Sequence, residues 1–381
     1  MRHSFEDFIR VLRKDINPLP FDEFRKTHNL TKLWEGMKED DIRRVYFNND
    51  LDAFYEWFYN FLNDDEKLKV FYDVYLAYKE FRPIEKLEIK NDIVITKPNS
   101  PSTLRNINLE EILKSSSKYH PTIFDKYKAA LETGKNMSSV TMPSVFSKSI
   151  KGNYKPFINT LKTIIMLPSI FSPNTYYTLL DEVYKIVGKD KVNILIPTAS
   201  WCSPVIAIDK SPLKDKVKKY HIIDVQENVL KNCIDLHKPE SVFDELPELK
   251  TFYIPSERMD EVIDNDYDIV FFCPPYYDLE LYDGDLQSIN LYPDYEEWLD
   301  KYWRKTVENS YNALNKGGIY SFVISKQING KKTIGQDLLE VAKEKFEFIR
   351  EIKIYPKSIE SGRSSNRATE RYESCFILKK V

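Results

Sequence analysis

The chain has 381 residues, of which 42% are hydrophobic and 30% charged, so it is long enough for two or three domains with buried cores. Its 56 Lys and Arg residues nearly balance 59 Asp and Glu residues, which excludes a strongly basic coat protein and a protein with an acidic tail. No apolar run approaches the roughly 18 residues of a membrane span, and Glu6 and Asp7 lie where a signal peptide would have its apolar core. We therefore expect a soluble cytoplasmic protein without a membrane partner.

Cysteine and histidine usage argues against a metal centre. The four cysteines, Cys202, Cys233, Cys273 and Cys375, are too widely spaced for a zinc site and too few for a disulfide framework. The five histidines show no ligand spacing. We expect no metal site and a reducing compartment.

The first part of the chain reads as helices. Residues 5–12 and 51–62 place apolar side chains at three- and four-residue intervals, which is the helical period. We predict a mainly helical N-terminal domain over residues 1–150, whose role the sequence does not indicate, and a second domain over residues 151–381.

The second domain shows short apolar runs that alternate with helical stretches, which is typical of an α/β sheet. Seven runs are expected to be strands: 192–196, 220–223, 251–254, 267–272, 318–324, 346–355 and 372–378. The last two alternate and are joined by a loop of about fifteen residues, so they should pair as an antiparallel hairpin. The pattern predicts a doubly wound sheet, with its ligand site outside the carboxyl ends of the strands.

The fourth of these runs leads directly into two prolines and two tyrosines, Cys273-Pro274-Pro275-Tyr276-Tyr277. Proline cannot continue a strand ladder, so a rigid turn should present a backbone carbonyl and an aromatic face at the strand end. These parts suit a planar heterocycle with an exocyclic amine. Two alternatives are a strand end without a ligand and a peptide motif for a WW domain, but the latter needs an exposed polyproline II segment rather than a buried strand.

The segment from Cys273 to Tyr282, together with residues 295–299, resembles motif IV of the amino-methyltransferases, which methylate adenine N6 or cytosine N4 in nucleic acid. The pattern of seven strands resembles the Rossmann-like fold of the enzymes that use S-adenosyl-L-methionine (AdoMet). The resemblance implies that Pro274 offers its carbonyl to the amine and that Tyr276 stacks on a flipped base. It makes Cys273, Pro274, Pro275 and Tyr276 the catalytic motif, AdoMet the cofactor and DNA the substrate, with RNA as an open alternative.

The same resemblance implies a cofactor site at the ends of the first three strands. The turn with Pro197, Thr198, Ala199 and Ser200 would contact the methionine part of AdoMet, and Asp224 would bond the ribose. Ser256 and Glu257 follow the third strand, where the family contacts the adenine. Asp224 could instead cap the following helix, and Ser256 and Glu257 could begin a helix. Trp201 and Cys202 are expected to be packing residues.

Two positions depart from the family pattern. Cys273 replaces the Asp, Asn or Ser that leads motif IV, and its thiol is a weaker hydrogen-bond acceptor. No glycine occurs between Gly188 and Gly284, so the first motif lacks the residue type that adopts positive φ without strain.

Nucleic-acid contact is expected from Tyr277 and from Arg363 and Arg367, which lie in the loop between the last two strands. We predict an AdoMet-dependent DNA methyltransferase that modifies adenine N6 ahead of cytosine N4. The alternative is a catalytically inactive methyltransferase-fold protein that serves as a nucleic-acid-binding or assembly subunit. The oligomeric state stays open.

Overall fold

The computed structural model divides the chain into two compact units, one of residues 80–108 and 169–381 and the other of residues 2–79 and 109–168. The structure describes residues 20–27, 30–36, 42–64, 84–97, single positions between 104 and 115, 170–239, 245–279, 281–282, 284–325, 334–356 and 372–381. The predicted boundary near residue 150 and the predicted helix at 5–12 lie outside these residues and stay predictions.

The described part of the N-terminal unit is helical. It contains α2 (Phe21–Thr27), α3 (Thr31–Gly36), α4 (Ile42–Phe47) and α5 (Leu51–Asn63). On α5 the buried residues Phe54 and Phe58 recur four positions apart, so they share one helix face. Phe54 packs edge-on against Phe47 of α4 with 5.5 Å between ring centroids, and Phe58 packs against Phe24 of α2 at 6.2 Å. The helical period over residues 51–62 is confirmed.

The second unit is built around one sheet in the order β1-β2-β8-β9-β7-β6-β3-β4-β5. Its seven main strands are β3 (Val192–Ile196), β4 (Val217–Asp224), β5 (Glu248–Tyr253), β6 (Tyr267–Phe272), β7 (Leu314–Ser325), β8 (Glu347–Tyr355) and β9 (Glu373–Lys379). Strands β3 to β7 pair in parallel, whereas β9 is antiparallel to both β7 and β8. The predicted seven-stranded α/β sheet with an antiparallel final hairpin is confirmed.

The chain reverses direction across the sheet between β3 and β6. From β3 it proceeds to β4 and β5 on one side, and it then returns to β6 and β7 on the other side. At this switch point, the connections that follow the two adjacent strands run to opposite faces of the sheet. The carboxyl ends of β3 and β6 therefore border a crevice.

The sheet has two more strands than the sequence predicted. Strands β1 (Ile89–Lys90) and β2 (Ile93–Ile95) form a hairpin through Asn91 and Asp92, both with positive φ, and β2 extends the sheet parallel to β8. The prediction of a helical region up to residue 150 did not anticipate this hairpin. Strands of two and three residues are too short to show a period of two, so only the Asn-Asp turn could have signalled them.

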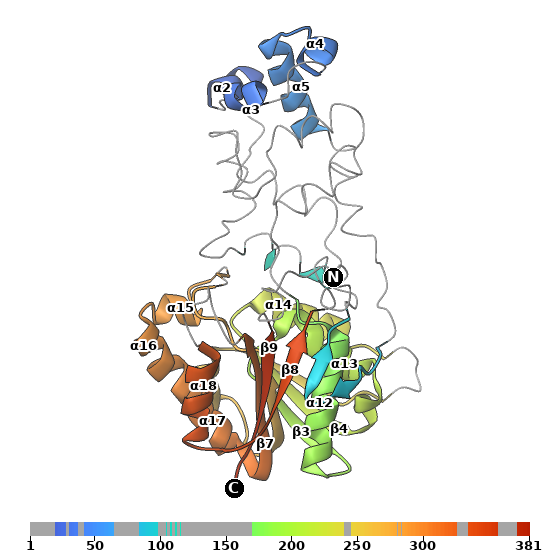
Figure 1. The fold of residues 1–381 in the computed structure, drawn as a ribbon, viewed down its shortest axis with the longest axis vertical. Helices are drawn as coiled ribbons and strands as arrows, with labels where there is room; N and C mark the ends of the chain where they lie inside the picture. Colours follow the sequence, from blue (N-terminus) through green and yellow to red (C-terminus); the bar gives the residue numbers. More distant parts are fainter. Residues whose placement is uncertain are drawn as a thin grey trace. The chain divides into compact units, whose positions relative to one another are not determined.

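Helices cover both faces of the sheet. In Figure 1, α12 (Pro173–Val187) and α13 (Ser203–Asp209) lie on one side of the strands, and α17 (Lys305–Ala313) and α18 (Ile334–Lys343) on the other. Helix α14 (Glu227–Leu236) follows β4, while α15 (Ser288–Leu291), α16 (Tyr295–Glu297) and the π-helical η4 (Trp298–Arg304) lead into α17. The described part of this unit also contains the 3₁₀ turns η1 (Ser200–Cys202), η2 (Pro212–Asp215) and η3 (Ser256–Glu261).

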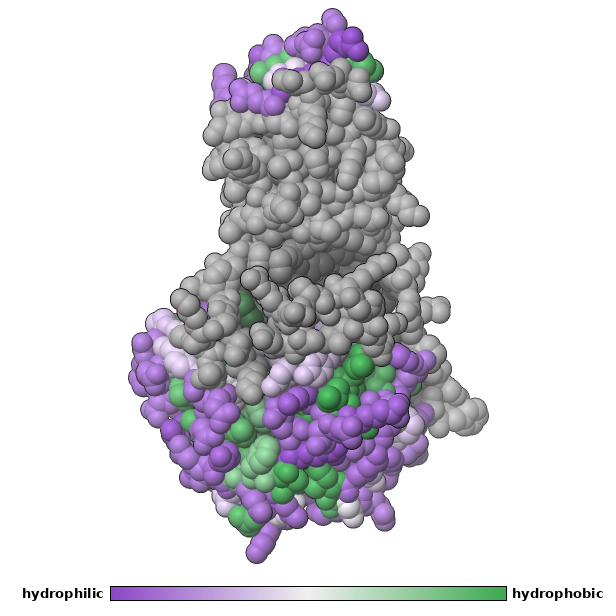
Figure 2. All heavy atoms as spheres, in the orientation of Figure 1, coloured by the Kyte–Doolittle hydropathy of each residue, from purple (hydrophilic) through white to green (hydrophobic). Residues whose placement is uncertain are grey.

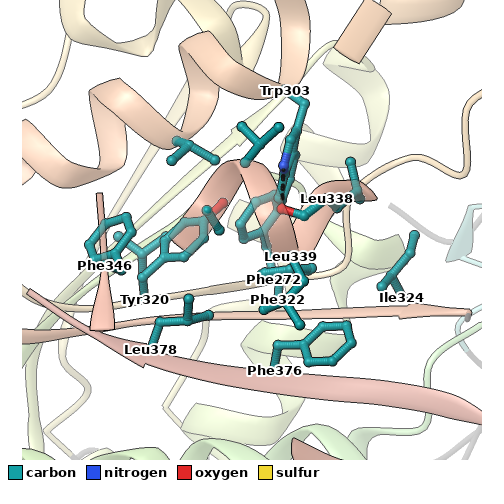
Figure 3. Close-up of a cluster of buried hydrophobic side chains, with 14 of the residues drawn as sticks. Phe272, Trp303, Tyr320, Phe322, Ile324, Leu338, Leu339, Phe346, Phe376 and Leu378 are labelled. Carbon is teal, nitrogen blue, oxygen red and sulfur yellow. Dashed lines mark hydrogen bonds between the residues drawn. The ribbon is translucent and has the colours of Figure 1, made fainter. Parts of the chain in front are cut away.

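An aromatic core fills the space between the sheet and α17 and α18 (Figure 3). Trp303 packs edge-on against Phe322 at 5.0 Å, and its indole N–H donates to the Leu338 carbonyl at 2.9 Å. Phe272, the last residue of β6, lies 5.9 Å from the Trp303 ring and is fully buried. This packing holds the end of β6 rigidly, immediately before the Cys273-Pro274 step.

The surface of the described residues complements this core. In the face shown in Figure 2, hydrophilic residues form most of the coloured surface, with apolar residues between them. None of the helices that the structure describes is both long and apolar enough to cross a membrane.

Candidate functional site

A pocket opens where β3, β4 and β6 end, with a free space of about 1100 Å³ that includes its mouth to solvent. Most of the residues that the sequence singled out line it. They are Pro197, Thr198, Ser200, Asp224, Ser256, Glu257, Cys273, Pro274, Pro275, Tyr276 and Tyr277. Ala199 is buried behind the wall, and Arg363 and Arg367 lie outside the described residues.

The turn after β6 is held from two sides. Just before the turn, within β6, the Phe271 carbonyl accepts a hydrogen bond from the Tyr176 hydroxyl of α12 at 3.1 Å. In front, the Thr198 hydroxyl donates to the Cys273 carbonyl at 2.8 Å, which ties the end of β6 to the turn after β3. The two predicted halves of the site are therefore in direct contact.

The turn after β3 adopts the left-handed backbone conformation without any glycine. Ser200, Trp201 and Cys202 have φ values of 44°, 57° and 67°. This conformation costs an L-residue roughly 1–2 kcal/mol because Cβ approaches the next carbonyl oxygen. The absent glycines had suggested that such a turn could not form freely, and the structure forms it at the cost of backbone strain. Strain of this kind is concentrated at functional sites.

Trp201 and Cys202 pack as expected. Trp201 is 7% exposed and meets Tyr282 edge-on at 5.6 Å, so it also forms part of the pocket wall. Cys202 is fully buried, with its thiol 3.7 Å from the Asn108 side-chain oxygen.

Asp224, the last residue of β4, has both carboxyl oxygens bonded to backbone amides. The N–H of Ala199 donates to one oxygen at 2.8 Å, and the N–H of Gln226 donates to the other at 2.9 Å. Asp224 thus fastens the strained turn and supports the start of α14 at once. Each oxygen keeps further acceptor capacity toward the pocket. Burial raises the pKa of Asp224 to about 6 although these amides lower it.

Ser256 and Glu257 begin η3, which α17 holds in place. The Asn309 side chain donates to the Glu257 carbonyl at 2.9 Å, and the hydroxyls of Ser256 and Thr306 lie 3.2 Å apart. The Glu257 side chain is 4% exposed, and neither carboxyl oxygen makes a hydrogen bond of normal length and angle to the described residues. Burial raises its pKa to about 7, outweighing the opposite influence of the Tyr292 hydroxyl and Arg258.

Several polar residues of the pocket wall were not predicted from the sequence, among them Gln226, Gln287, Ser288 and Glu373. The Gln226 side-chain nitrogen is buried without a hydrogen-bond partner in the described structure. Glu373, the first residue of β9, accepts a hydrogen bond from the Tyr276 hydroxyl at 2.7 Å. Loss of water around its carboxyl raises the pKa of Glu373, which the Tyr276 hydroxyl lowers. The sequence held one signal for Glu373, because an antiparallel last strand begins at the edge where the parallel strands end.

Tyr277 is mainly a packing residue. It is 7% exposed, donates to the Pro293 carbonyl at 2.5 Å, and meets the rings of Tyr295 and Trp298 edge-on. Its suggested contact with nucleic acid therefore stays a prediction without structural support. Within the described ranges, no three His, Cys, Asp or Glu side chains converge as a metal site would require.

No protein-family model and no curated protein matches this sequence. Solved structures do resemble it. The N-methyltransferase NodS from Bradyrhizobium japonicum, in complex with S-adenosyl-L-homocysteine, is 14% identical, with 54% of this chain and 86% of NodS covered and a TM-score of 0.36. TrmN from Thermus thermophilus is 12% identical over 56% of this chain and 50% of its own length, with a TM-score of 0.37. An rRNA methylase from Streptococcus thermophilus is 14% identical, with 56% of this chain and 99% of the methylase covered and a TM-score of 0.33. At such scores the likeness carries no argument, and the fold rests on the strand order and pairing above.

Proposed function

We propose that the protein is an AdoMet-dependent methyltransferase that modifies an exocyclic base amine in DNA, adenine N6 ahead of cytosine N4. The observation that carries the proposal is that the cofactor-type residues and the Cys273–Tyr276 turn line the same pocket. A hydrogen bond from Thr198 to the Cys273 carbonyl joins the two sets.

The polar groups of the pocket suit an adenosine-containing ligand. Asp224 presents acceptors of the kind that ribose hydroxyls require. Among the described residues, the buried Glu257 carboxyl has no hydrogen-bond donor at normal length and angle, and the buried Gln226 amide nitrogen has no acceptor. An adenine ring offers both an amine and ring nitrogens, so it can satisfy the two groups. Unpaired buried polar groups cost about 1–3 kcal/mol each, which binding would recover.

The other half of the pocket suits a flat base. When bound, AdoMet supplies an electrophilic methyl group, and the substrate nitrogen needs mainly a correct approach. The Tyr276 ring offers a stacking face, and its hydroxyl is held by Glu373. The Pro274 carbonyl offers an acceptor for the amine, as the resemblance to motif IV implies. Adenine has the larger stacking surface of the two amine-bearing bases.

The second candidate is an inactive methyltransferase-fold protein that binds nucleic acid or an assembly partner. Two departures from the family motifs favour it: Cys273 at the lead position of motif IV and the absence of glycine from the turn after β3.

Calorimetric titration of AdoMet into the purified protein is the first test. We expect micromolar binding that weakens about 100-fold in Asp224→Ala, because hydrogen bonds from ribose to a carboxylate contribute about 1.5–3 kcal/mol. Asp235→Ala is the matched control, because this half-buried aspartate of α14 does not line the pocket, and it should bind normally.

Transfer of a labelled methyl group to unmodified DNA and RNA then separates the candidates. Transfer to DNA supports the proposal, whereas AdoMet binding without transfer to either polymer favours the inactive protein. No AdoMet binding, with and without DNA, would reject the enzyme.

A further inference from the structure

We infer that Glu373 determines the specificity of the target pocket by accepting a hydrogen bond from the substrate amine. This inference rests on the proposed function and names the group that takes the place of the missing acceptor at Cys273. It concerns a residue that lies about one hundred positions from the turn it completes.

The sheet register brings Glu373 to the pocket. Phe272 of β6 pairs with Phe322 of β7, and Phe322 pairs with Phe376 of β9. Because β9 is antiparallel, Glu373 lies three residues beyond Phe376 toward the carboxyl ends of β6 and β7, opposite Ser325. Glu373 therefore lines the same wall as Cys273 and Pro274.

The carboxyl of Glu373 is under-used within the described structure. It is partly buried, makes no ion pair with a described residue, and accepts one side-chain hydrogen bond, from Tyr276. A carboxylate has about four acceptor positions and is rarely buried without a cation. The Tyr276 hydroxyl donates to it, so the carboxyl acts as an acceptor and fixes the stacking ring beside it.

The chemistry of the substrate explains the need for this group. An exocyclic amine presents two N–H donors, and the Pro274 carbonyl can take one of them. The Cys273 thiol is a weak acceptor, which leaves Glu373 as the strong acceptor in this wall. A carboxylate attracts an amine and repels a carbonyl oxygen at the same position. The pocket should thus select adenine or cytosine over bases that carry an oxygen there.

The test compares strands that differ only in the amine, in the presence of saturating S-adenosyl-L-homocysteine. Fluorescence anisotropy would measure the affinity for a DNA dodecamer of deoxyadenosine and for a dodecamer of purine 2′-deoxyriboside, which lacks the amine. A dodecamer pair of deoxycytidine and deoxyuridine tests the repulsion of oxygen. The native protein should bind the amine-bearing strand at least about tenfold more tightly, as one charge-assisted hydrogen bond implies.

Glu373→Ala should reduce this preference to less than about twofold while S-adenosyl-L-homocysteine binds normally. Glu373→Gln, which keeps the shape and one acceptor oxygen, provides the second variant if the alanine variant does not fold, and its preference should fall between the two. Glu351→Ala is the matched control, because Glu351 bonds Ser374 on the neighbouring strand and does not line the pocket.

The outcomes separate this inference from the proposed function. A preference that persists in both Glu373 variants, or that is absent from the native protein, overturns the inference. Tyr276→Phe separates direct contact from ring positioning. If Glu373 only orients the ring, Tyr276→Phe and Glu373→Ala will both weaken the binding of all DNA strands equally. The preference for the amine-bearing strand will then stay intact. Failure of the native protein to bind S-adenosyl-L-homocysteine overturns the proposed function instead.

Discussion

At the scale of single residues, burial removes water from the Asp224 and Glu257 carboxyl groups of the pocket, as it does from Glu373. Burial raises the pKa of Asp224 from 3.8 to about 6 and that of Glu257 from 4.5 to about 7. A shift of about two units corresponds to roughly 3 kcal/mol per group. Both carboxylates therefore destabilise the ligand-free protein at neutral pH, which is expected where polar groups are arranged for a ligand rather than for stability.

Glu257→Gln should remove part of the pH dependence of stability. Because its folded pKa lies above the unfolded value, the folded state binds the extra proton between pH 4.5 and about 7. The free energy of unfolding of the native protein thus contains a Glu257 contribution that is present below pH 4.5 and lost as the pH rises through about 7. In the variant, stability at pH 8 should exceed that of the native protein by about 2–3 kcal/mol, measured by urea unfolding across this range.

Glu347→Gln, at an exposed position at the start of β8, is the control and should leave the pH profile unchanged. Equal profiles for the native protein and Glu257→Gln would contradict the assigned burial effect. The same variant should bind AdoMet more weakly, so a gain in stability would accompany a loss of affinity.

At the scale of elements, the connection from β3 to α13 combines strain with support. Three successive residues adopt positive φ, and the Ala199 N–H that precedes them is bonded to Asp224. The hydroxyl of Ser200 is buried without a partner in the described structure. The element is therefore held by its surroundings and not by its own backbone preferences.

Ser200→Gly should stabilise the protein by about 1 kcal/mol. Glycine relieves roughly 1–2 kcal/mol of strain from the left-handed conformation. Its greater freedom in the unfolded chain offsets about 0.5–1 kcal/mol of this stabilisation. Thermal unfolding of the ligand-free protein would measure the difference.

Ser203→Gly makes the same change three residues later, where φ is −56° and the hydroxyl donates to the Phe171 carbonyl at 2.6 Å. It should destabilise by about 1–2 kcal/mol. A loss of stability in both variants would show that the Ser200 turn is not strained.

At the scale of the whole molecule, the net charge of −3 provides no general attraction for nucleic acid. Under the proposed function, contact with DNA would depend on local basic groups, of which Arg363 and Arg367 remain the predicted pair. Their double replacement by alanine should weaken binding to duplex DNA. The slope of log K against log salt concentration should become about two units less steep, because each phosphate contact contributes about 0.9 to it. AdoMet affinity should stay constant.

Replacement of Lys185 and Lys231, which pair with acidic residues one helical turn away, provides a control of equal charge. An equal loss of slope in this control would mean that net charge, and not the predicted loop, governs binding.

The accuracy of the strand predictions depended on burial. Strands β3 and β6 are buried along their entire length, and their bounds were predicted to the residue. Strands β4, β5 and β7 begin earlier than predicted. Their first residues include polar ones, such as Lys218 in β4, which break the apolar pattern. The site residues came from a resemblance between motifs and not from periodicity, so their roles remain predictions.

Local features could be predicted from the amino-acid order alone: where apolar residues recur at a period of two or 3.6, and where prolines end a strand. These depend on neighbours within a few positions. Contacts between residues far apart in the chain became known from the folded structure. It brought Glu373 to Tyr276 across 97 positions and Ala199 to Asp224 across 25. It also buried the Glu257 carboxyl where no described residue donates a regular hydrogen bond to it. The physical reason is that strand order and register, set by packing of the whole sheet, align the strand ends at one edge.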